Sequence, residues 1–341
     1  MPYNHWTTAF AKTAQPPDPL AKRDTAVPHP PIPHRKARIG LALGSGSARG
    51  WSHIGVIQAL EKAGIHCDIV CGCSIGAIVA AAYANGRLHH LEEGVRKLDN
   101  WNILQFFELS LNTRGFIDSE RLNVFFEQYV CSTDLLIENL EKPFGSVATE
   151  LKTGREVWFK SGSLLNAIWS SFALPGLFSP VKHQDKWLID GGLVNPVPVS
   201  LCRALGADIV IAVNLNGDLV GHRNQLQSTP SGKAPPVVDE DQDIIDSLTS
   251  LIRKKSLSLF TPDEGDSRTP PSLIETMAAS INITQDHITR SRMAGNPPDI
   301  MLCPRLSQIG LLEIDRGDEA ITEGKRCVER LLPEIEYLIN I

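Results

Sequence analysis

Short apolar runs alternate with helically spaced apolar positions along most of the chain after residue 37. Runs of strand length occupy 37–43, 68–72, 142–149, 155–160, 186–190, 208–213 and 299–303. Apolar residues at helical spacing predict helices over 51–62, 75–85, 163–172, 199–205, 273–288 and 320–339, and 87–140 is mainly helical. Strands joined by one right-handed helix lie parallel, so their C-terminal ends should share one rim. The β-branched run 208–213 predicts a central strand that is covered on both faces.

Two segments interrupt this pattern. Residues 1–37 hold eight prolines, and up to Arg38 six basic residues stand against two acidic ones, which predicts a disordered, weakly basic arm. Residues 217–271 are rich in Ser, Pro, Gly, Lys and Asp, which predicts a flexible insertion, with an interfacial lid as the alternative. One domain over 38–341, interrupted by this insertion, accounts for the rest.

Composition narrows the function classes. The net charge of −6 gives no reason to expect a nucleic-acid partner. No stretch approaches the roughly 18 unbroken apolar residues of a membrane span, and the first residues lack the order of a secretory signal. Seven cysteines, an odd number, favour a reducing compartment, so we expect a cytoplasmic protein. Cys67, Cys71 and Cys73 lack the spacing of a zinc site and are expected to be buried small hydrophobic residues, without a metal.

The stretch 71–76 has the form of a nucleophile elbow. In Gly72-Cys-Ser74-Ile-Gly76 a serine stands between two glycines, where an apolar strand ends and an alanine-rich helix begins. A serine at such a cramped turn projects its hydroxyl above the sheet, and the glycines let neighbouring backbone come close. The alternative is a plain glycine turn, because matches this short are common.

A glycine-rich loop follows the first strand. Gly44-Ser-Gly-Ser-Ala-Arg-Gly50 lies between a strand and a helix, so its backbone N–H groups can receive something negative. A dinucleotide phosphate is one candidate, but Arg49 occupies the place of the third fingerprint glycine. An oxyanion of an acyl ester needs the same donors. The serine elbow on the next strand favours the oxyanion.

A third motif lies at the end of the strand 186–190. Asp190 enters a double-glycine turn, Gly191-Gly192, and Asn195, Pro196 and Pro198 follow. An Asp-Gly turn, in which aspartate bonds its own backbone, explains most such cases. A carboxylate at a strand end beside glycines is also suited to act as a base.

These three motifs in this order closely resemble those of bacterial patatin-like phospholipases, the group related to the esterase domain of neuropathy target esterase. Residues 51–57, 174–180 and 195–198 add to the resemblance, which covers 38–214 well and 271–341 loosely. It implies a three-layer α/β/α hydrolase fold with a mainly parallel central sheet. It also implies a Ser-Asp dyad, with Ser74 as nucleophile and Asp190 as base. Gly44, Ser45, Gly46 and Ser47 form the oxyanion hole by this analogy, and the family often has glycine where this chain has Ser45 and Ser47. Arg49, Gly50, Gly72, Gly76, Gly191 and Gly192 support these motifs, and Arg49 is expected to brace the loop.

The resulting hypothesis is a serine acyl-ester hydrolase that works through an acyl-enzyme, without cofactor or metal. Its substrate is an acyl lipid or ester, met in transient contact with a membrane surface. A catalytically quiet lipid- or partner-binding regulatory protein and a nucleotide-dependent enzyme are the rivals. A histidine is the alternative base, and His287 gives the order Ser, Asp, His of ordinary α/β-hydrolases. Six aromatic residues either belong to the core or line an acyl channel: Trp101, Phe106, Phe107, Phe116, Phe125 and Phe126.

Overall fold

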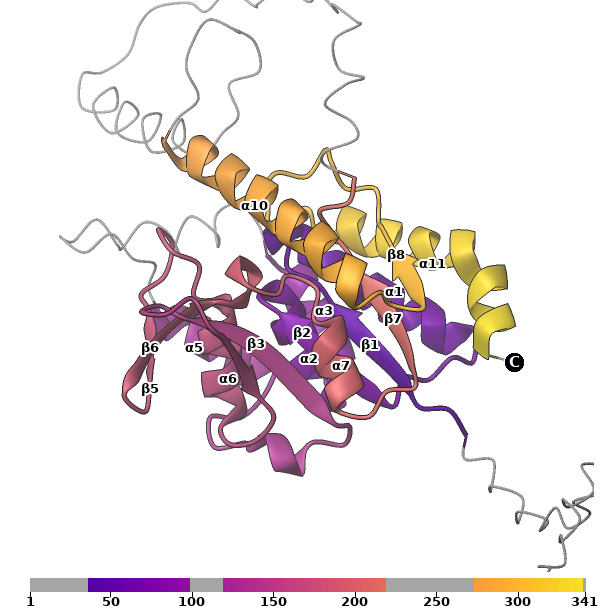
Figure 1. The fold of residues 1–341 in the computed structure, drawn as a ribbon, viewed down its shortest axis with the longest axis horizontal. Helices are drawn as coiled ribbons and strands as arrows, with labels where there is room; N and C mark the ends of the chain where they lie inside the picture. The colour runs from indigo at the N-terminus through magenta and orange to yellow at the C-terminus, as the bar shows by residue number, and fades with distance from the viewer. Residues whose placement is uncertain (1–35, 99–118, 219–272, 340–341) are drawn as a thin grey trace, which may run out of the picture. The chain divides into compact units, whose positions relative to one another are not determined.

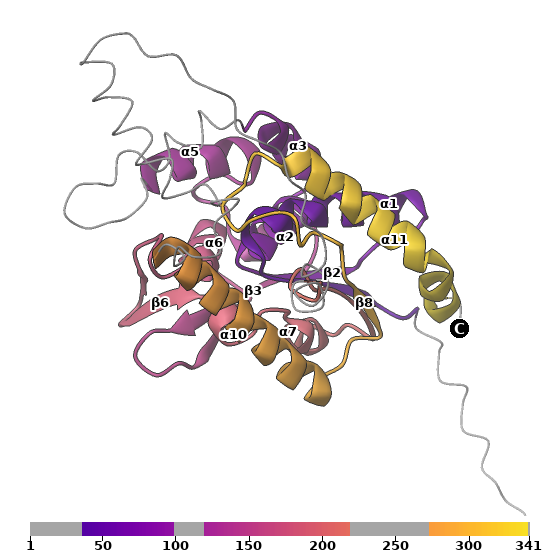
Figure 2. The ribbon, with the colours of Figure 1, turned by 90° about the horizontal axis from the view of Figure 1, so that it is seen from above.

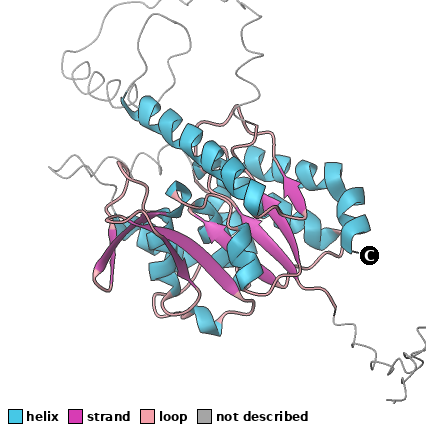
Figure 3. Cartoon of the chain, in the orientation of Figure 1, coloured by secondary structure: helices cyan, strands magenta, loops and turns pink. Residues whose placement is uncertain are grey.

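A mainly parallel sheet forms the centre of the molecule. The computed structural model describes residues 36–98, 119–218 and 273–339. Within these residues the sheet has eight strands in the order β5-β6-β3-β2-β1-β7-β8, and β4 pairs with β3. The strands are β1 (Ile39–Leu43), β2 (Ile69–Cys73), β3 (Phe144–Glu150), β4 (Glu156–Phe159), β5 (Val181–His183), β6 (Lys186–Asp190), β7 (Ile209–Val213) and β8 (Ile300–Leu302). Figure 3 shows the strands as one twisted sheet between helices.

Helices cover both faces of this sheet. One face is packed by α1 (Ser52–Lys62), α2 (Ile75–Ala84), α3 (Leu88–Arg96), α5 (Ser119–Tyr129), α6 (Leu164–Phe172) and α11 (Gly317–Ile339). The other face carries α7 (Val199–Ala204) and α10 (Leu273–Gly295) (Figures 1 and 2). Short 3₁₀ turns complete the chain: η1 (Ser47–Trp51), η3 (Ile137–Asn139) and η4 (Gly191–Leu193). These layers confirm the three-layer α/β/α fold.

Alternation along the strands divides the core in two. In β1, Leu41 and Leu43 pack with α1 and α2, whereas Ala42 packs with Val199 and Leu201 of α7. In β7, alternate residues likewise enter the two clusters, which confirms a central strand covered on both faces. Burial on both faces explains why these strands read as continuous apolar runs rather than as alternating ones.

Several predicted boundaries shift. α10 continues to Gly295, beyond the predicted end at 288, and α11 begins at Gly317, before the predicted start at 320. β5 was not predicted, because its three residues follow a proline-containing loop and pair only with β6. Residues 1–35 of the predicted arm, 219–271 of the predicted insertion and four of the six aromatic residues, at 101–116, lie outside the described residues. Within the described parts, no helix is both long and apolar enough to cross a membrane.

Candidate active site

Ser74 occupies a strained turn between β2 and α2. Its backbone has φ 56° and ψ −124°, in the left-handed half of the map that residues other than glycine rarely enter. The two flanking glycines allow this turn: a Cβ on Gly72 would lie 2.2 Å from the carbonyl oxygen of Gly76, and one on Gly76 would lie 2.3 Å from that of Leu43. The helix therefore starts in direct backbone contact with the strand ends, and the strand-turn-helix context predicted for the elbow is present.

β3 is the strand along which Ser74 and Asp190 meet. Its first half pairs in parallel with β2, as far as Cys73 opposite Val147, and its second half pairs antiparallel with β6, from Asp190 opposite Ala148. β4 occupies the other edge of β3 over 146–149, so β2 and β6 share one edge and run toward each other. Their C-terminal residues face consecutive positions of β3. This register brings together two residues that are 116 positions apart in sequence.

A short hydrogen bond joins the two side chains. Oγ of Ser74 donates to Oδ2 of Asp190 at 2.5 Å, and the N–H of Gly192 donates to Oδ1 at 2.7 Å. Oγ1 of Thr149 donates to the backbone carbonyl of Asp190 at 2.8 Å and fixes the strand end. Asp190 is fully buried, and this burial raises the pKa of its carboxyl to about 6, although both hydrogen bonds act in the opposite direction.

Histidine takes no part in this contact within the described residues. His53, the nearest candidate to the glycine-rich loop, donates from Nε2 to the carbonyl oxygen of Gly44 at 2.8 Å. It is fully buried, and desolvation lowers its pKa to about 4, so it is neutral at pH 7. His287 is exposed on α10. Over 36–98, 119–218 and 273–339, the hydrogen bond to Asp190 is thus the side-chain contact of the Ser74 hydroxyl, and no histidine extends it.

The glycine-rich loop leaves two backbone donors open. The N–H of Gly44 donates to the carbonyl of Val213 at 3.0 Å, and the N–H of Ser45 donates to that of Pro196 at 2.8 Å. In the described structure, the N–H groups of Gly46 and Ser47 donate to no protein acceptor. Ser47 has φ 52°, so serine adopts here the left-handed conformation that glycine would take more easily. The four donors proposed for an oxyanion thus reduce to two that are free.

Arg49 contacts this loop from inside the protein. Its side chain is 1% exposed, and Nε donates to the carbonyl of Gly46 at 3.2 Å while Nη2 donates to Oδ1 of Asn282 on α10 at 2.9 Å. Burial lowers the pKa of its guanidinium to about 10, so it stays charged at pH 7. Nη1 is buried without a hydrogen-bond partner in the part of the chain that is described. The hydrogen bond to Gly46 ties the loop to the side chain of Arg49, and its role as a brace stays a prediction.

Other motif residues hold the loop and turn in close contact. Gly50 lies against Ile75, since a Cβ there would approach its side chain to 2.2 Å, and Gly191 lies against the carbonyl of Val147. The backbone N–H of Ser74 donates to Oγ of Ser171 at 2.9 Å. Ser171, Thr149 and Asn282 carry no sequence motif, and sequence reasoning did not single them out.

A small cavity opens over Ser74. Its volume is about 20 Å³, room for one water molecule. Four polar residues line it, Ser45, Ser47, Ser74 and Gln285, and its other walls are apolar. Those apolar residues are Phe172, Leu174, Leu177, Phe178, Ile281 and Leu311. The loop 174–180 that resembles the family pattern therefore forms a wall of this cavity.

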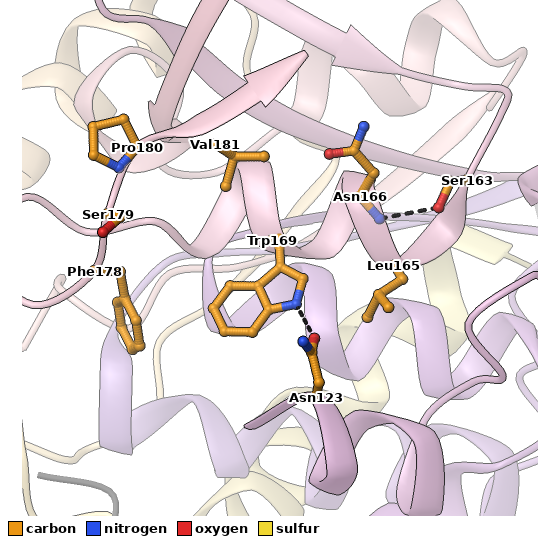
Figure 4. A pocket seen from close by; sticks show the side chains of 9 residues that line it. All are labelled: Asn123, Ser163, Leu165, Asn166, Trp169, Phe178, Ser179, Pro180 and Val181. Carbon is orange, nitrogen blue, oxygen red and sulfur yellow. Dashed lines mark hydrogen bonds between the residues drawn. The ribbon is translucent and has the colours of Figure 1, made fainter. Parts of the chain in front are cut away.

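A larger cavity lies on the far side of Phe178. It measures about 450 Å³ and contains Trp169, Asn123 and Ser179 among its lining residues (Figure 4). Nε1 of Trp169 donates to Oδ1 of Asn123 at 2.6 Å, and the ring of Trp169 meets that of Phe178 edge to face at 6.0 Å. Phe178 lines both cavities, so it separates the larger one from Ser74.

Phe125 and Phe126, the two described aromatic residues with an open assignment, are core residues or pack against the core. Phe126 is 1% exposed and packs edge to face on Trp169, and Phe125 packs on Phe126. Neither lines the larger cavity.

The three clustered cysteines are buried free thiols. Cys67, Cys71 and Cys73 lie in the core, and burial raises the pKa of each thiol above its ordinary value. Across 36–98, 119–218 and 273–339, no group of three or more His, Cys, Asp or Glu side chains could hold a metal ion.

Comparison with known proteins shows which family the chain belongs to. Residues 41–203 match the family model described as patatin-like phospholipase. Uncharacterized NTE family protein Rv1063c of Mycobacterium tuberculosis is 30% identical over 334 residues, which cover 88% of this chain and 92% of that protein. The chain belongs to the patatin-like phospholipase family.

Two further matches are more distant. Lysophospholipase NTE1 of Pyricularia oryzae is 28% identical over 300 residues, which cover 85% of this chain and 18% of that protein. The crystal structure of VipD from Legionella pneumophila matches with a TM-score of 0.36 and 15% identity, over 90% of this chain and 77% of that chain. The family match spans the glycine-rich loop, the serine elbow and Asp190, and it ends before α10.

Proposed function

We propose that this chain is a serine acyl-ester hydrolase in which Ser74 is the nucleophile and Asp190 the general base. The observation that carries the proposal is the 2.5 Å hydrogen bond from Oγ of Ser74 to a fully buried carboxylate. A serine hydroxyl is a weak nucleophile until an adjacent base takes its proton. A carboxyl with a pKa of about 6 is mostly ionised at pH 7 and basic enough to accept a proton during the reaction.

The proposed cycle has two halves. Oγ of Ser74 attacks the ester carbonyl carbon as its proton passes to Asp190, and the carbonyl oxygen becomes an oxyanion. The bond to the alcohol then breaks, and the alcohol leaves with the proton from Asp190. Water attacks the acyl-enzyme while Asp190 takes its proton, and the acid is released as Ser74 regains a proton. The same carboxylate thus serves as base and acid in each half.

The free N–H groups of Gly46 and Ser47 would receive the oxyanion. Donors that are already aimed at developing charge stabilise the transition state without reorganisation, and removal of one such donor elsewhere costs about 2.7–4 kcal/mol. Arg49 strengthens this site, because the carbonyl of Gly46 that accepts its hydrogen bond belongs to the same peptide unit as the N–H of Ser47. A donor on that carbonyl polarises the N–H at the other side of the peptide.

The two cavities near Ser74 limit the size and shape of the substrate. Only about 20 Å³ is open at Ser74, so a lipid ester must displace the apolar wall that includes Leu177 and Phe178. A turn of the Phe178 ring would join this space to the 450 Å³ cavity, large enough for part of an acyl chain or its alcohol. The NTE1 relative is named a lysophospholipase, which supports phospholipid or lysophospholipid esters as the substrate class. We propose that the enzyme is cytoplasmic and binds membrane surfaces transiently to reach these lipids. Co-sedimentation with lipid vesicles would test the membrane binding.

Hydrolysis of p-nitrophenyl esters of graded chain length tests the proposal. The parent protein should release nitrophenol and react with a fluorophosphonate probe. Ser74→Ala should do neither, and Asp190→Asn should lose at least about a thousandfold in kcat. A folded parent that neither turns over ester nor reacts with the probe would favour the alternative, a catalytically quiet protein that binds lipid or a partner.

A further inference from the structure

Gln285 lines the small cavity over Ser74, although it belongs to none of the sequence motifs. It lies on α10, which crosses the end of the sheet near β3 and α7 (Figure 2), and its side chain is only 2% exposed. It lines the same 20 Å³ cavity as Ser74 and, among the described residues, is the only carboxamide to do so. Burial of a carboxamide costs desolvation free energy that an apolar residue at the same place in the wall would not cost. A functional role of Gln285 would account for this cost.

The orientation of this carboxamide is fixed from behind. Nδ2 of Asn216, which follows β7, donates to Oε1 of Gln285 at 3.0 Å. Asn216 is itself 1% exposed, and its backbone N–H donates to Oδ1 of Asn214. With Oε1 held, the amide of Gln285 presents Nε2, a donor, on its other side.

Gly192 marks the point toward which this donor is directed. A Cβ on Gly192 would lie 2.3 Å from Nε2 of Gln285, 2.9 Å from Oδ1 of Asp190 and 3.0 Å from Oγ of Ser45. Two polar atoms, from α10 and from the glycine-rich loop, thus lie near the carboxylate of the base. The second glycine after Asp190 keeps this corner free of a side chain.

We propose that Gln285 positions the water that hydrolyses the acyl-enzyme. A buried water needs about 10–15 Å³ and two to four polar partners, and the cavity supplies that volume with Gln285, Ser45 and Ser74 in its wall. Oδ2 of Asp190 lies directly behind this wall, 2.5 Å from Oγ of Ser74. Once Ser74 is acylated, its proton no longer occupies Oδ2 of Asp190. Nε2 of Gln285 then donates to the water oxygen, whose proton passes to Asp190 as the new bond to the acyl carbon forms. The bond to Oγ of Ser74 breaks, and that oxygen takes the proton from Asp190.

This inference rests on the proposed hydrolase function. Separate measurement of acylation and deacylation distinguishes a failure of the inference from a failure of that function. In a stopped-flow assay with a p-nitrophenyl ester, Gln285→Met keeps the length of the side chain but removes the donor. Acylation should stay within about twofold of the parent, whereas deacylation should fall about tenfold to a hundredfold, the cost of a misplaced reactant. A burst of nitrophenol equal to the enzyme concentration should appear, and mass spectrometry should find acylated Ser74 accumulating.

Two further variants control the experiment. Asn216→Ala leaves Gln285 in place but frees its carboxamide, so deacylation should slow by a smaller factor, again without a change in acylation. Thr284→Val, an exposed neighbour on α10, should match the parent in both steps.

Each outcome has one meaning. Equal losses in both steps, or no loss in either, would overturn the role of Gln285 in an enzyme that is otherwise active. If the parent itself forms no acyl-enzyme, the proposed function fails, and this inference fails with it. If Gln285→Met is found unfolded by circular dichroism, Asn216→Ala decides: unchanged deacylation would contradict the proposal.

Discussion

The nucleophile and the base of this site are held in place by different forces. Ser74 sits between β2 and α2 on a strained backbone, and close contact between main-chain atoms fixes it. Asp190 sits at the end of β6 with a negative φ of −46° and is fixed by hydrogen bonds from Gly192 and Thr149. Close main-chain contact is therefore the main constraint on Ser74, beside one hydrogen bond to Ser171. Hydrogen bonds hold the carboxylate and carbonyl of Asp190, beside the close contact of Gly191 with Val147. The first half should tolerate no added atom, and the second should respond to charge and to loss of a donor.

The largest combined loss of activity and stability is expected where an atom is added to the nucleophile half. In Gly76→Ala the new Cβ would lie 2.3 Å from the carbonyl oxygen of Leu43 and 2.8 Å from that of Gly44, both backbone atoms that cannot turn aside. Either the end of β1 or the start of α2 must move, so we expect a loss of at least about a hundredfold in kcat and of about 2–3 kcal/mol in the free energy of unfolding.

Urea denaturation and ester turnover measure this effect. Gly295→Ala at the end of α10 is the matched control, because a Cβ there meets no atom within 4 Å. It should leave both quantities near the parent values. Full activity of Gly76→Ala would show that close backbone contact does not set the position of Ser74.

A change of charge in the base half should raise stability while it removes activity. The carboxyl of Asp190 keeps its proton up to about pH 6 in the folded protein, against about 3.8 in the unfolded chain. The folded state thus binds more protons between these values, and the free energy of unfolding falls as pH rises through the window. Asp190→Asn does not titrate, so its advantage over the parent should grow by about 2–3 kcal/mol between pH 4 and pH 8.

Urea titrations of Asp190→Asn and the parent at both pH values measure this advantage. Ser74→Ala, which keeps the carboxyl, serves as the control and should follow the pH dependence of the parent in direction. An advantage that does not change with pH would contradict the raised pKa of Asp190.

Arg49 lies outside both halves and links the glycine-rich loop to α10, so a smaller effect is expected there. Arg49→Met keeps most of the side-chain volume but removes the donors to Gly46 and Asn282. We expect kcat to fall about tenfold, because the peptide unit that carries the N–H of Ser47 loses its polarising partner. The free energy of unfolding should change by less than about 1 kcal/mol, because the removed charge is also costly to bury.

Steady-state kinetics beside urea denaturation separate these two quantities for Arg49→Met. A variant with normal kcat but a large loss of stability would mean that Arg49 is structural only.

The smallest effect is expected at Thr149. Thr149→Val preserves the shape of the side chain and removes only the hydrogen bond to the backbone of Asp190. We expect a loss of about 1 kcal/mol in the free energy of unfolding and less than threefold in kcat. A much larger loss of activity would place Thr149 in the chemistry rather than in the support of β6.

The nucleophile half could be read from the sequence because its contacts are local. Gly72, Ser74 and Gly76 form one short motif, and the parallel pairing of β1 with β2 puts the glycine-rich loop at the same rim. Asp190 was named through its motif and the resemblance, but its approach to Ser74 depends on the shared edge of β3, a register that no local pattern specifies.

Other features of the site were beyond local patterns. The sequence of 44–47 does not show that the N–H groups of Gly44 and Ser45 donate to backbone carbonyls of the fold. Gln285 lies in a polar helical stretch after 219–272, and only its packing against Gly192 makes it part of the site.

The most direct test of the account is the pH dependence of the reaction between Ser74 and a fluorophosphonate. The labelling rate of the parent should rise with pH through about 6 and then level, because Asp190 must be ionised to accept the proton of Ser74. His53→Gln, which retains a donor to Gly44, should keep this profile, and Asp190→Asn should lose both the rise and nearly all of the rate. Retention of the profile by Asp190→Asn, with its loss in His53→Gln, would show that a histidine is the base and would contradict the Ser74–Asp190 pair.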